Sequence, residues 1–122
     1  DISDFEELPE TRDFYMRQYY TIQNESSVSF MGWILFLEGI AAGFGATAKT
    51  RTQSYGKDST KFLHLHADED VGHLENAFKT IEALPKADTE RLIRNMADSC
   101  QRYLSILDCI ENKSKILEAS VL

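Results

Sequence analysis

The chain has 122 residues, 43% of them hydrophobic, and a formal net charge of −7, which suits one folded domain or a piece of one. The acidic charge argues against nucleic acid and anionic membrane surfaces as partners, because both bind basic surfaces. No signal peptide is visible. The two cysteines, Cys100 and Cys109, lie about 13 Å apart along one predicted helix, too far to form a disulfide with each other. They therefore indicate buried free thiols and a reducing, cytoplasmic compartment.

The hydrophobic pattern predicts four helices and no strand. The first is predicted over about Pro9–Asn24, where aromatic residues recur at helical spacing and a proline suits the first turn. The second is predicted to follow directly and to run to about Thr52. Ser26 or Ser27 is its expected N-cap, because a serine hydroxyl can accept a hydrogen bond from an amide of the first turn.

A break in the pattern separates these helices from two more. Asp58 or Ser59 is expected to cap a third helix over Thr60–Leu84, which a proline ends. Asp88 is expected to cap the fourth helix. This helix carries an apolar stripe with steps of three and four residues: Leu92, Met96, Cys100, Tyr103, Leu107 and Ile110. Short connections between long helices favour antiparallel neighbours, so the predicted fold class is all-α, an antiparallel helical bundle.

One stretch of the second helix, FMGWILFLEGIAAGFGA over residues 30–46, contains a single ionisable side chain, that of Glu38. The stretch is shorter than the roughly 20 residues of a membrane span, and a carboxylate near its midpoint costs about 2.5 kcal/mol or more in lipid. It is therefore predicted to be a core helix of a bundle. A carboxylate in such a core must be protonated, paired with a cation from another helix, or bound to a metal ion.

The third helix contains the sequence HADEDVGH, in which His66, Asp70 and His73 fall on one helical face. If the second and third helices are antiparallel neighbours, Glu38 faces this trio. Two imidazoles and two carboxylates suit iron or manganese better than thiolate-bound zinc, and two histidines with one carboxylate form a known non-haem iron site. The predicted metal ligands are therefore Glu38, His66, Asp70 and His73. The alternative for the trio is a solvated or structurally paired helix face.

These residues also resemble a known family, the haem-oxygenase-like diiron oxidases, or iron-containing redox enzymes. The family is similar in its H-x-x-x-D-x-x-H helix, matched here by His66, Asp70 and His73. It also has a glutamate among small residues on the preceding long helix, matched by Glu38 in LEGIAAGFG. The resemblance covers essentially the whole chain and implies a haem-oxygenase-like helical fold with two iron ions per complete domain, manganese being the alternative. Relatives use O₂ to oxidise fatty acids, amino acids and related small molecules.

Family domains are about twice as long and begin with helices that carry a further glutamate and a histidine. This chain has no clear counterpart, because Glu6, Glu7, Glu10 and Asp13 belong to an acidic, solvated stretch. We therefore expect the chain, which starts at Asp1 rather than at methionine, to be the C-terminal half of a longer domain. Its partner is then an absent N-terminal half or a second copy of the chain. An open apolar face is expected along Trp33, Phe36, Leu37, Ile40 and Phe44.

The function that the resemblance implies is an O₂-dependent non-haem diiron oxidase or oxygenase acting on a small molecule. Two alternatives stay open. A metal-independent, thiaminase-type relative would need a cysteine nucleophile, and neither Cys100 nor Cys109 has a histidine or acid at a useful spacing. A non-catalytic helical interaction module would carry the same residues as a vestigial metal site.

Overall fold

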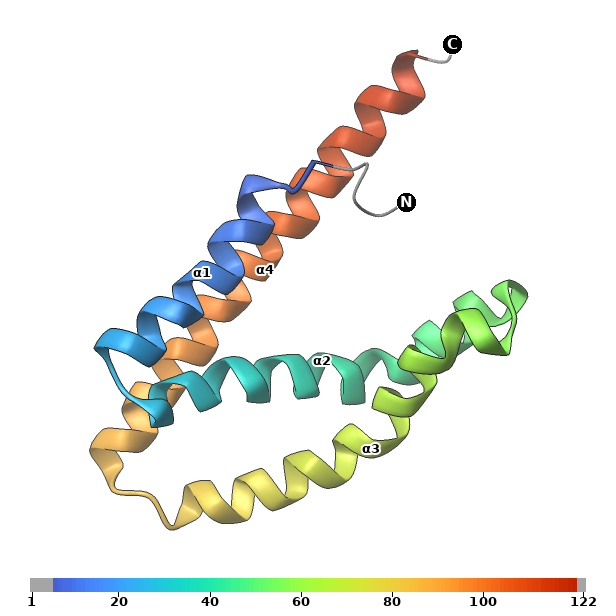
Figure 1. The fold of residues 1–122 in the computed structure, drawn as a ribbon. Coiled ribbons are helices and arrows are strands. Elements are labelled where there is room, and N and C mark those ends of the chain that lie inside the picture. The colour runs from blue at the N-terminus through green and yellow to red at the C-terminus, as the bar shows by residue number, and fades with distance from the viewer. Residues whose placement is uncertain (1–5, 121–122) are drawn as a thin grey trace.

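The computed structural model describes residues 6–120, without the side chains of residues 57, 67, 68, 71 and 120. The described chain is all-helical, which confirms the predicted all-α class (Figure 1). Its elements in chain order are α1 (Pro9–Asn24), α2 (Ser27–Thr52), the short 3-10 helix η2 (Gln53–Tyr55), α3 (Lys57–Glu82) and α4 (Lys86–Ser120).

The first two helices have the boundaries that the sequence predicts. α1 begins with Pro9, whose lack of an amide proton does no harm in a first helical turn. α2 begins at Ser27 because Ser26 is the N-cap, and the Ser26 side chain accepts a hydrogen bond from the amide of Ser29 at 3.1 Å. Of the two serines proposed as N-caps, the first therefore has that role.

The predicted cap of α3 is wrong. The helix begins at Lys57, three residues earlier than predicted, so neither Asp58 nor Ser59 is its N-cap. Its N-cap is Gly56, which has a φ of 83°. Residues with a side chain rarely adopt a backbone conformation with this positive φ. Gly56 therefore lets the chain turn tightly between α2 and α3. A turn made by backbone conformation needs no acidic or hydroxyl cap.

The start of α4 also differs from the prediction. α4 begins at Lys86, and Asp88 therefore lies in its first turn instead of capping it. The carbonyl of Pro85 accepts hydrogen bonds from the amides of Asp88 and Thr89, at 2.9 and 3.1 Å, and this starts the helix. α3 ends at Glu82, two residues before the predicted end, in a turn that precedes the proline.

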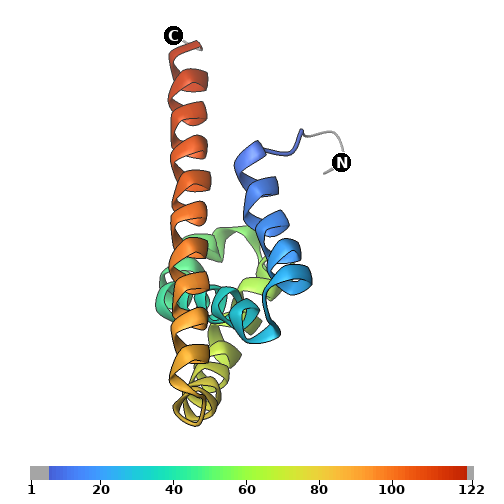
Figure 2. The same cartoon turned by 90° about the vertical axis from the view of Figure 1, so that its left-hand side faces the viewer.

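α2 lies at the centre of the fold and packs against both α3 and α4 (Figures 1 and 2). α3 returns alongside α2 after the turn at Gly56, whereas α4 crosses α2 and continues beyond it. α1 runs antiparallel to α4, because Arg17 pairs with Asp98 while Asp13 pairs with Arg102. The end of α4 extends past α1 in both views.

α2 and α4 cross in close contact at Gly32. A Cβ atom at this glycine would lie 2.2 Å from the carbonyl oxygen of Leu92 and 2.7 Å from the amide nitrogen of Met96. Both neighbours are backbone atoms, which cannot turn aside. The missing side chain therefore fixes how α4 sits on α2, and with it the position of Tyr103 further along α4.

The hydrophobic core is small. Among the large apolar side chains described, those of Phe14, Leu35 and Leu92 are buried. Polar side chains fill much of the space between α1 and α4, including Gln18 and Asn95, which hydrogen-bond to each other at 3.0 Å. An aromatic cluster connects three helices: Phe14, Phe30, Trp33, Phe36 and Tyr103.

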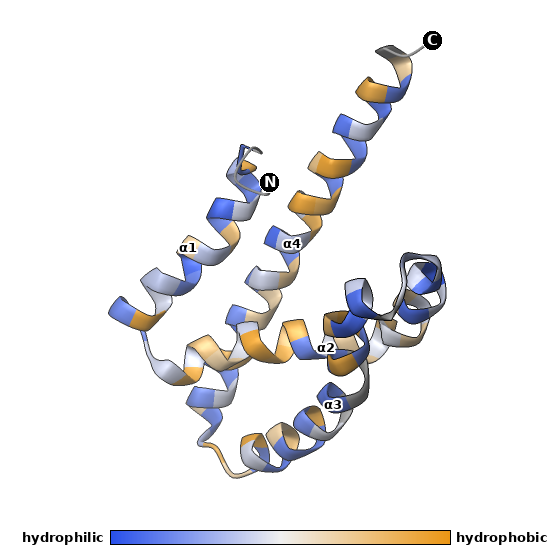
Figure 3. Cartoon of the chain, turned by 45° about the vertical axis from the view of Figure 1, so that its right-hand side comes forward, coloured by the Kyte–Doolittle hydropathy of each residue, from blue (hydrophilic) through white to orange (hydrophobic). Residues whose placement is uncertain are grey.

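Much apolar surface stays exposed. Figure 3 shows where hydrophobic residues, in orange, lie along α2 and α4. Phe44 is 66% exposed, and the other members of the predicted open stripe on α2 are partly exposed. Within the described residues, Ser27–Tyr55 is also long and apolar enough to cross a membrane. Core helices of soluble proteins meet the same criterion of length and composition.

Candidate metal centre

The predicted ligands meet because α2 and α3 form an antiparallel hairpin. Glu38 and His73 lie equally far from the turn at Tyr55–Gly56, so the return of α3 along α2 places them opposite each other. Glu38 Oε1 lies 3.8 Å from His73 Nδ1. Asp70, one helical turn before His73, reaches the same nitrogen at 3.3 Å. Two of the predicted ligands, Glu38 and Asp70, thus converge on the imidazole of a third, His73.

Burial differs sharply among these three side chains. Asp70 is 4% exposed, and the side chains of Glu38 and His73 are 23% and 55% exposed. The sequence pointed to Glu38 as the buried acid of an apolar helix, but the structure gives that place to Asp70. A buried carboxylate needs a cation or several hydrogen-bond donors. Among the described side chains, the imidazole of His73 is the one that pairs with the Asp70 carboxylate.

The fourth predicted ligand, His66, faces its own helix. His66 Nδ1 lies 3.0 Å from the carbonyl oxygen of Phe62, and the two rings stack with centroids 4.1 Å apart. A carbonyl oxygen only accepts hydrogen bonds, so Nδ1 carries the proton in this contact. In the tautomer with its single proton on Nδ1, Nε2 is the nitrogen that can bind a metal ion. Histidine ligands are commonly oriented by such a bond from the nitrogen that does not bind the metal.

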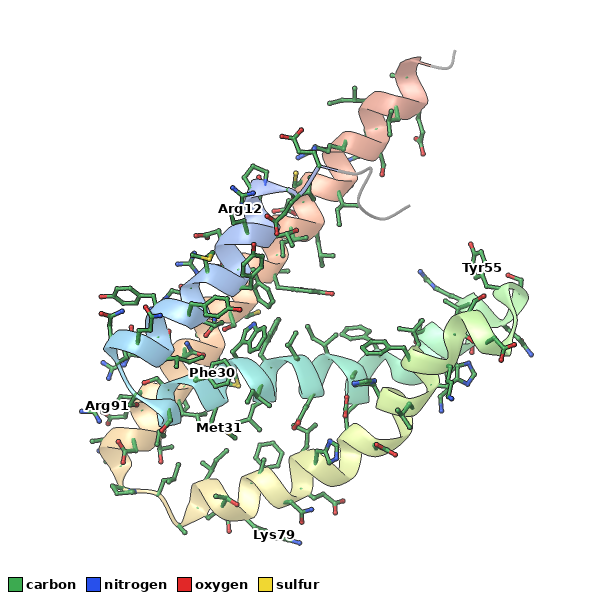
Figure 4. All side chains as sticks on the ribbon, viewed as in Figure 1. Arg12, Phe30, Met31, Tyr55, Lys79 and Arg91 are labelled. Carbon is green, nitrogen blue, oxygen red and sulfur yellow. The ribbon has the colours of Figure 1, made fainter. Side chains whose placement is uncertain are left out.

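All four predicted ligands line one pocket of about 580 Å³ between α2 and α3. The side chains of both helices project into the space that separates them (Figure 4). The remaining walls are almost entirely apolar and are contributed by α2 and α3, with one residue from α4. The pocket therefore combines a polar cluster of acids and histidines with a larger hydrophobic wall, as small-molecule sites commonly do.

The cluster is not a preformed metal site. Within the described residues, no three histidine, cysteine or acidic side chains are arranged to hold a metal ion as they stand. The contacts explain this, because His66 bonds to the backbone while Glu38 and Asp70 both approach the same nitrogen of His73. Side-chain rotations within the pocket would be needed to direct all four groups at one ion.

Sequence reasoning missed Tyr103 as part of this pocket. The residue belongs to the apolar stripe predicted for α4, and its ring contacts with Phe14 and Phe36 are those of a packing residue. It also lines the pocket, because α4 crosses α2 next to it. The available signal was weak: a tyrosine is the most polar member of an otherwise hydrophobic stripe. Its position depends on the crossing at Gly32, which the sequence alone does not reveal.

Comparison with known proteins matched no family model, no characterised protein and no solved structure. Any functional conclusion therefore depends on the residues of the pocket and their geometry.

Proposed function

We propose that this chain supplies an iron-binding half of an O₂-dependent non-haem diiron oxidase or oxygenase with a haem-oxygenase-like fold. Its substrate would be a small molecule such as a fatty acid, an amino acid or a related metabolite. The observation that carries the proposal is the gathering of Glu38, His66, Asp70 and His73 around one largely apolar pocket. The ligands still needed for two ions would come from an absent N-terminal half or from a second copy of the chain.

The separations of the donor atoms support this proposal. Two ligand atoms that each lie about 2.1 Å from one ion are roughly 3.0–3.4 Å apart. Asp70 Oδ1 and His73 Nδ1, at 3.3 Å, already have this separation, and Glu38 Oε1 is slightly further away, at 3.8 Å from His73 Nδ1. A cation between these groups would also compensate the buried Asp70 carboxylate. The donor set therefore fits iron or manganese once these side chains rotate toward one ion.

Each residue has a defined part in the proposed site. Glu38 and Asp70 neutralise the charge of the ion, and the hydrogen bond to the Phe62 carbonyl keeps Nε2 of His66 available. The apolar walls bind the substrate and exclude water from the reacting atoms. Iron, when bound, would supply the reductive activation of O₂. Walls of this kind select apolar molecules but do not identify the substrate.

The non-catalytic interaction module is the second candidate. Two observations favour it: the described residues form no ready-made site of three ligands, and the His73 side chain is 55% exposed. α4 also carries exposed apolar side chains that could contact a partner: Leu104, Leu107, Ile110, Ile116 and Leu117. In this alternative, the contact between His73 and Asp70 is an ordinary ion pair.

The thiaminase-type alternative receives less support. Cys100 lines an adjoining apolar pocket of about 430 Å³, next to Phe36 and Leu104, and does not line the pocket with the histidines. Burial raises the pKa of the Cys109 thiol, and the nearby Glu10 raises it further. A raised pKa disfavours the thiolate, which is the nucleophilic form.

Anaerobic titration with Fe(II) tests the proposal. We expect saturable binding that Asp70→Asn and His66→Ala each weaken by about tenfold or more. His64→Ala is the matched control, because His64 lies on α3 but does not line the pocket, and it should leave binding unchanged. Iron-dependent O₂ uptake with ascorbate as reductant then separates an oxidase from a site that only binds metal. Equal binding by His64→Ala and His66→Ala, or no binding at all, would favour the interaction module.

A further inference from the structure

A second pocket lies at the start of α2, where α1 ends and α4 passes close by. Its volume is about 660 Å³, and its polar lining comes from all three helices. Ser29, which lines this pocket, precedes Glu38 by nine residues and so lies about 14 Å from it along α2. The pocket is therefore separate from the candidate metal centre. Arg91, labelled in Figure 4, marks this end of the molecule.

The charges that line the pocket are only partly paired. Arg17 is neutralised by Glu25 and Asp98, at 2.8 and 3.0 Å. Arg94 also lines the pocket, and it forms no ion pair or hydrogen bond with any other residue that the structure describes. Arg91 stands three residues earlier, on the same helical face, and bonds only to the partly exposed Asp88. The pocket thus has one unpaired guanidinium group, that of Arg94, beside that of Arg91, which keeps donors beyond its single bond to Asp88.

A buried acceptor lies beside these cations. Asn95 lines the pocket and is 3% exposed. Its amide nitrogen donates to Gln18 Oε1 on α1 at 3.0 Å, but its Oδ1 is buried and accepts no hydrogen bond in the described structure. A buried acceptor without a donor is unusual in a folded protein.

We propose that this pocket binds a small phosphate monoester that carries a hydroxyl group. Arg91 and Arg94 would bind the phosphate, since guanidinium groups match its oxygens with paired hydrogen bonds. The hydroxyl of the same molecule would donate to Asn95 Oδ1 after a rotation of this side chain that uncovers the buried oxygen. The first turn of α2, whose Ser26 cap lines the pocket, adds a favourable helix dipole. The proposal does not depend on the presence of iron in the other pocket.

Isothermal titration with three compounds tests both parts of this site: inorganic phosphate, ethyl phosphate and 2-hydroxyethyl phosphate. The last two differ essentially by one hydroxyl, so tighter binding of 2-hydroxyethyl phosphate is expected from the bond to Asn95. Arg94→Gln and Arg91→Gln should each weaken binding by about tenfold. Arg51→Gln removes the same charge from an exposed position outside the pocket and should change binding less than about twofold.

Three results would overturn the proposal. The first is the absence of saturable binding by any of the three compounds. The second is an equal effect of Arg51→Gln and Arg94→Gln, which would mean that the anion senses only overall charge. The third is equal affinity for ethyl phosphate and 2-hydroxyethyl phosphate, which would remove the role of Asn95. Circular dichroism of each variant checks that the helices are retained.

Discussion

Replacing Gly32 with alanine should separate α2 from α4. The added Cβ would lie 2.2 Å from the carbonyl oxygen of Leu92, whereas such contacts normally exceed about 3.2 Å, so the helices must move apart by about 1 Å. Overpacking of this kind costs about 1–3 kcal/mol. Both clashing neighbours are backbone atoms, which places the cost at the upper end of that range. Alanine recovers about 1 kcal/mol of helix propensity, so the expected net loss is about 2 kcal/mol.

Urea denaturation followed by circular dichroism measures this loss, and Gly39→Ala and Gly43→Ala are matched controls on the same helix. A Cβ atom at either control position meets nothing within 4 Å. Each control should therefore gain up to about 1 kcal/mol from helix propensity alone. Equal effects of Gly32→Ala and Gly39→Ala would refute the close crossing of α2 and α4. Loss of stability in all three variants would show instead that α2 needs flexibility along its length.

Three further predictions concern charge, the metal site and assembly. Burial raises the pKa of Asp98, but hydrogen bonds and ion pairs with Arg102 and Arg17 outweigh it, so the pKa is lowered overall. The ionised carboxylate therefore stabilises the fold above about pH 4, and this stabilisation is lost as pH falls through the lowered pKa. Acid unfolding of Asp98→Asn should therefore show a smaller loss of stability over this range than that of the unsubstituted chain. Glu38→Gln should raise the melting temperature without metal and weaken Fe(II) binding, whereas the exposed Glu75→Gln should do neither. Light scattering after size-exclusion chromatography should show an oligomer, because so much apolar surface is exposed; a monomer that unfolds cooperatively and binds two irons would contradict this.

The helices could be predicted from local chemistry, and their turns only in part. α1 and α2 begin and end where the sequence indicates, because a first-turn proline and a serine cap act within a few residues. The start of α3 was misplaced, because a positive φ at Gly56 replaces the expected side-chain cap. Nothing in the residues around position 56 distinguishes a glycine that turns the chain from one that merely interrupts a pattern.

The candidate site could likewise be predicted only in part from local sequence. The shared face of His66, Asp70 and His73 follows from helical spacing, and the meeting of Glu38 with His73 follows from an antiparallel hairpin. It was harder to predict that Asp70 is more buried than Glu38, because this depends on which side of α3 faces α2. The place of Tyr103 depends on a crossing between distant segments, which no local pattern encodes.

We propose that Glu38, His66, Asp70 and His73 bind iron together in the pocket between α2 and α3. Anomalous diffraction at the iron edge, from crystals grown anaerobically with Fe(II), tests it most directly. We predict a peak in this pocket, with the donor atoms of the four side chains about 2.0–2.3 Å from it. A peak elsewhere, or no peak in crystals in which these side chains are well ordered, would contradict the claim.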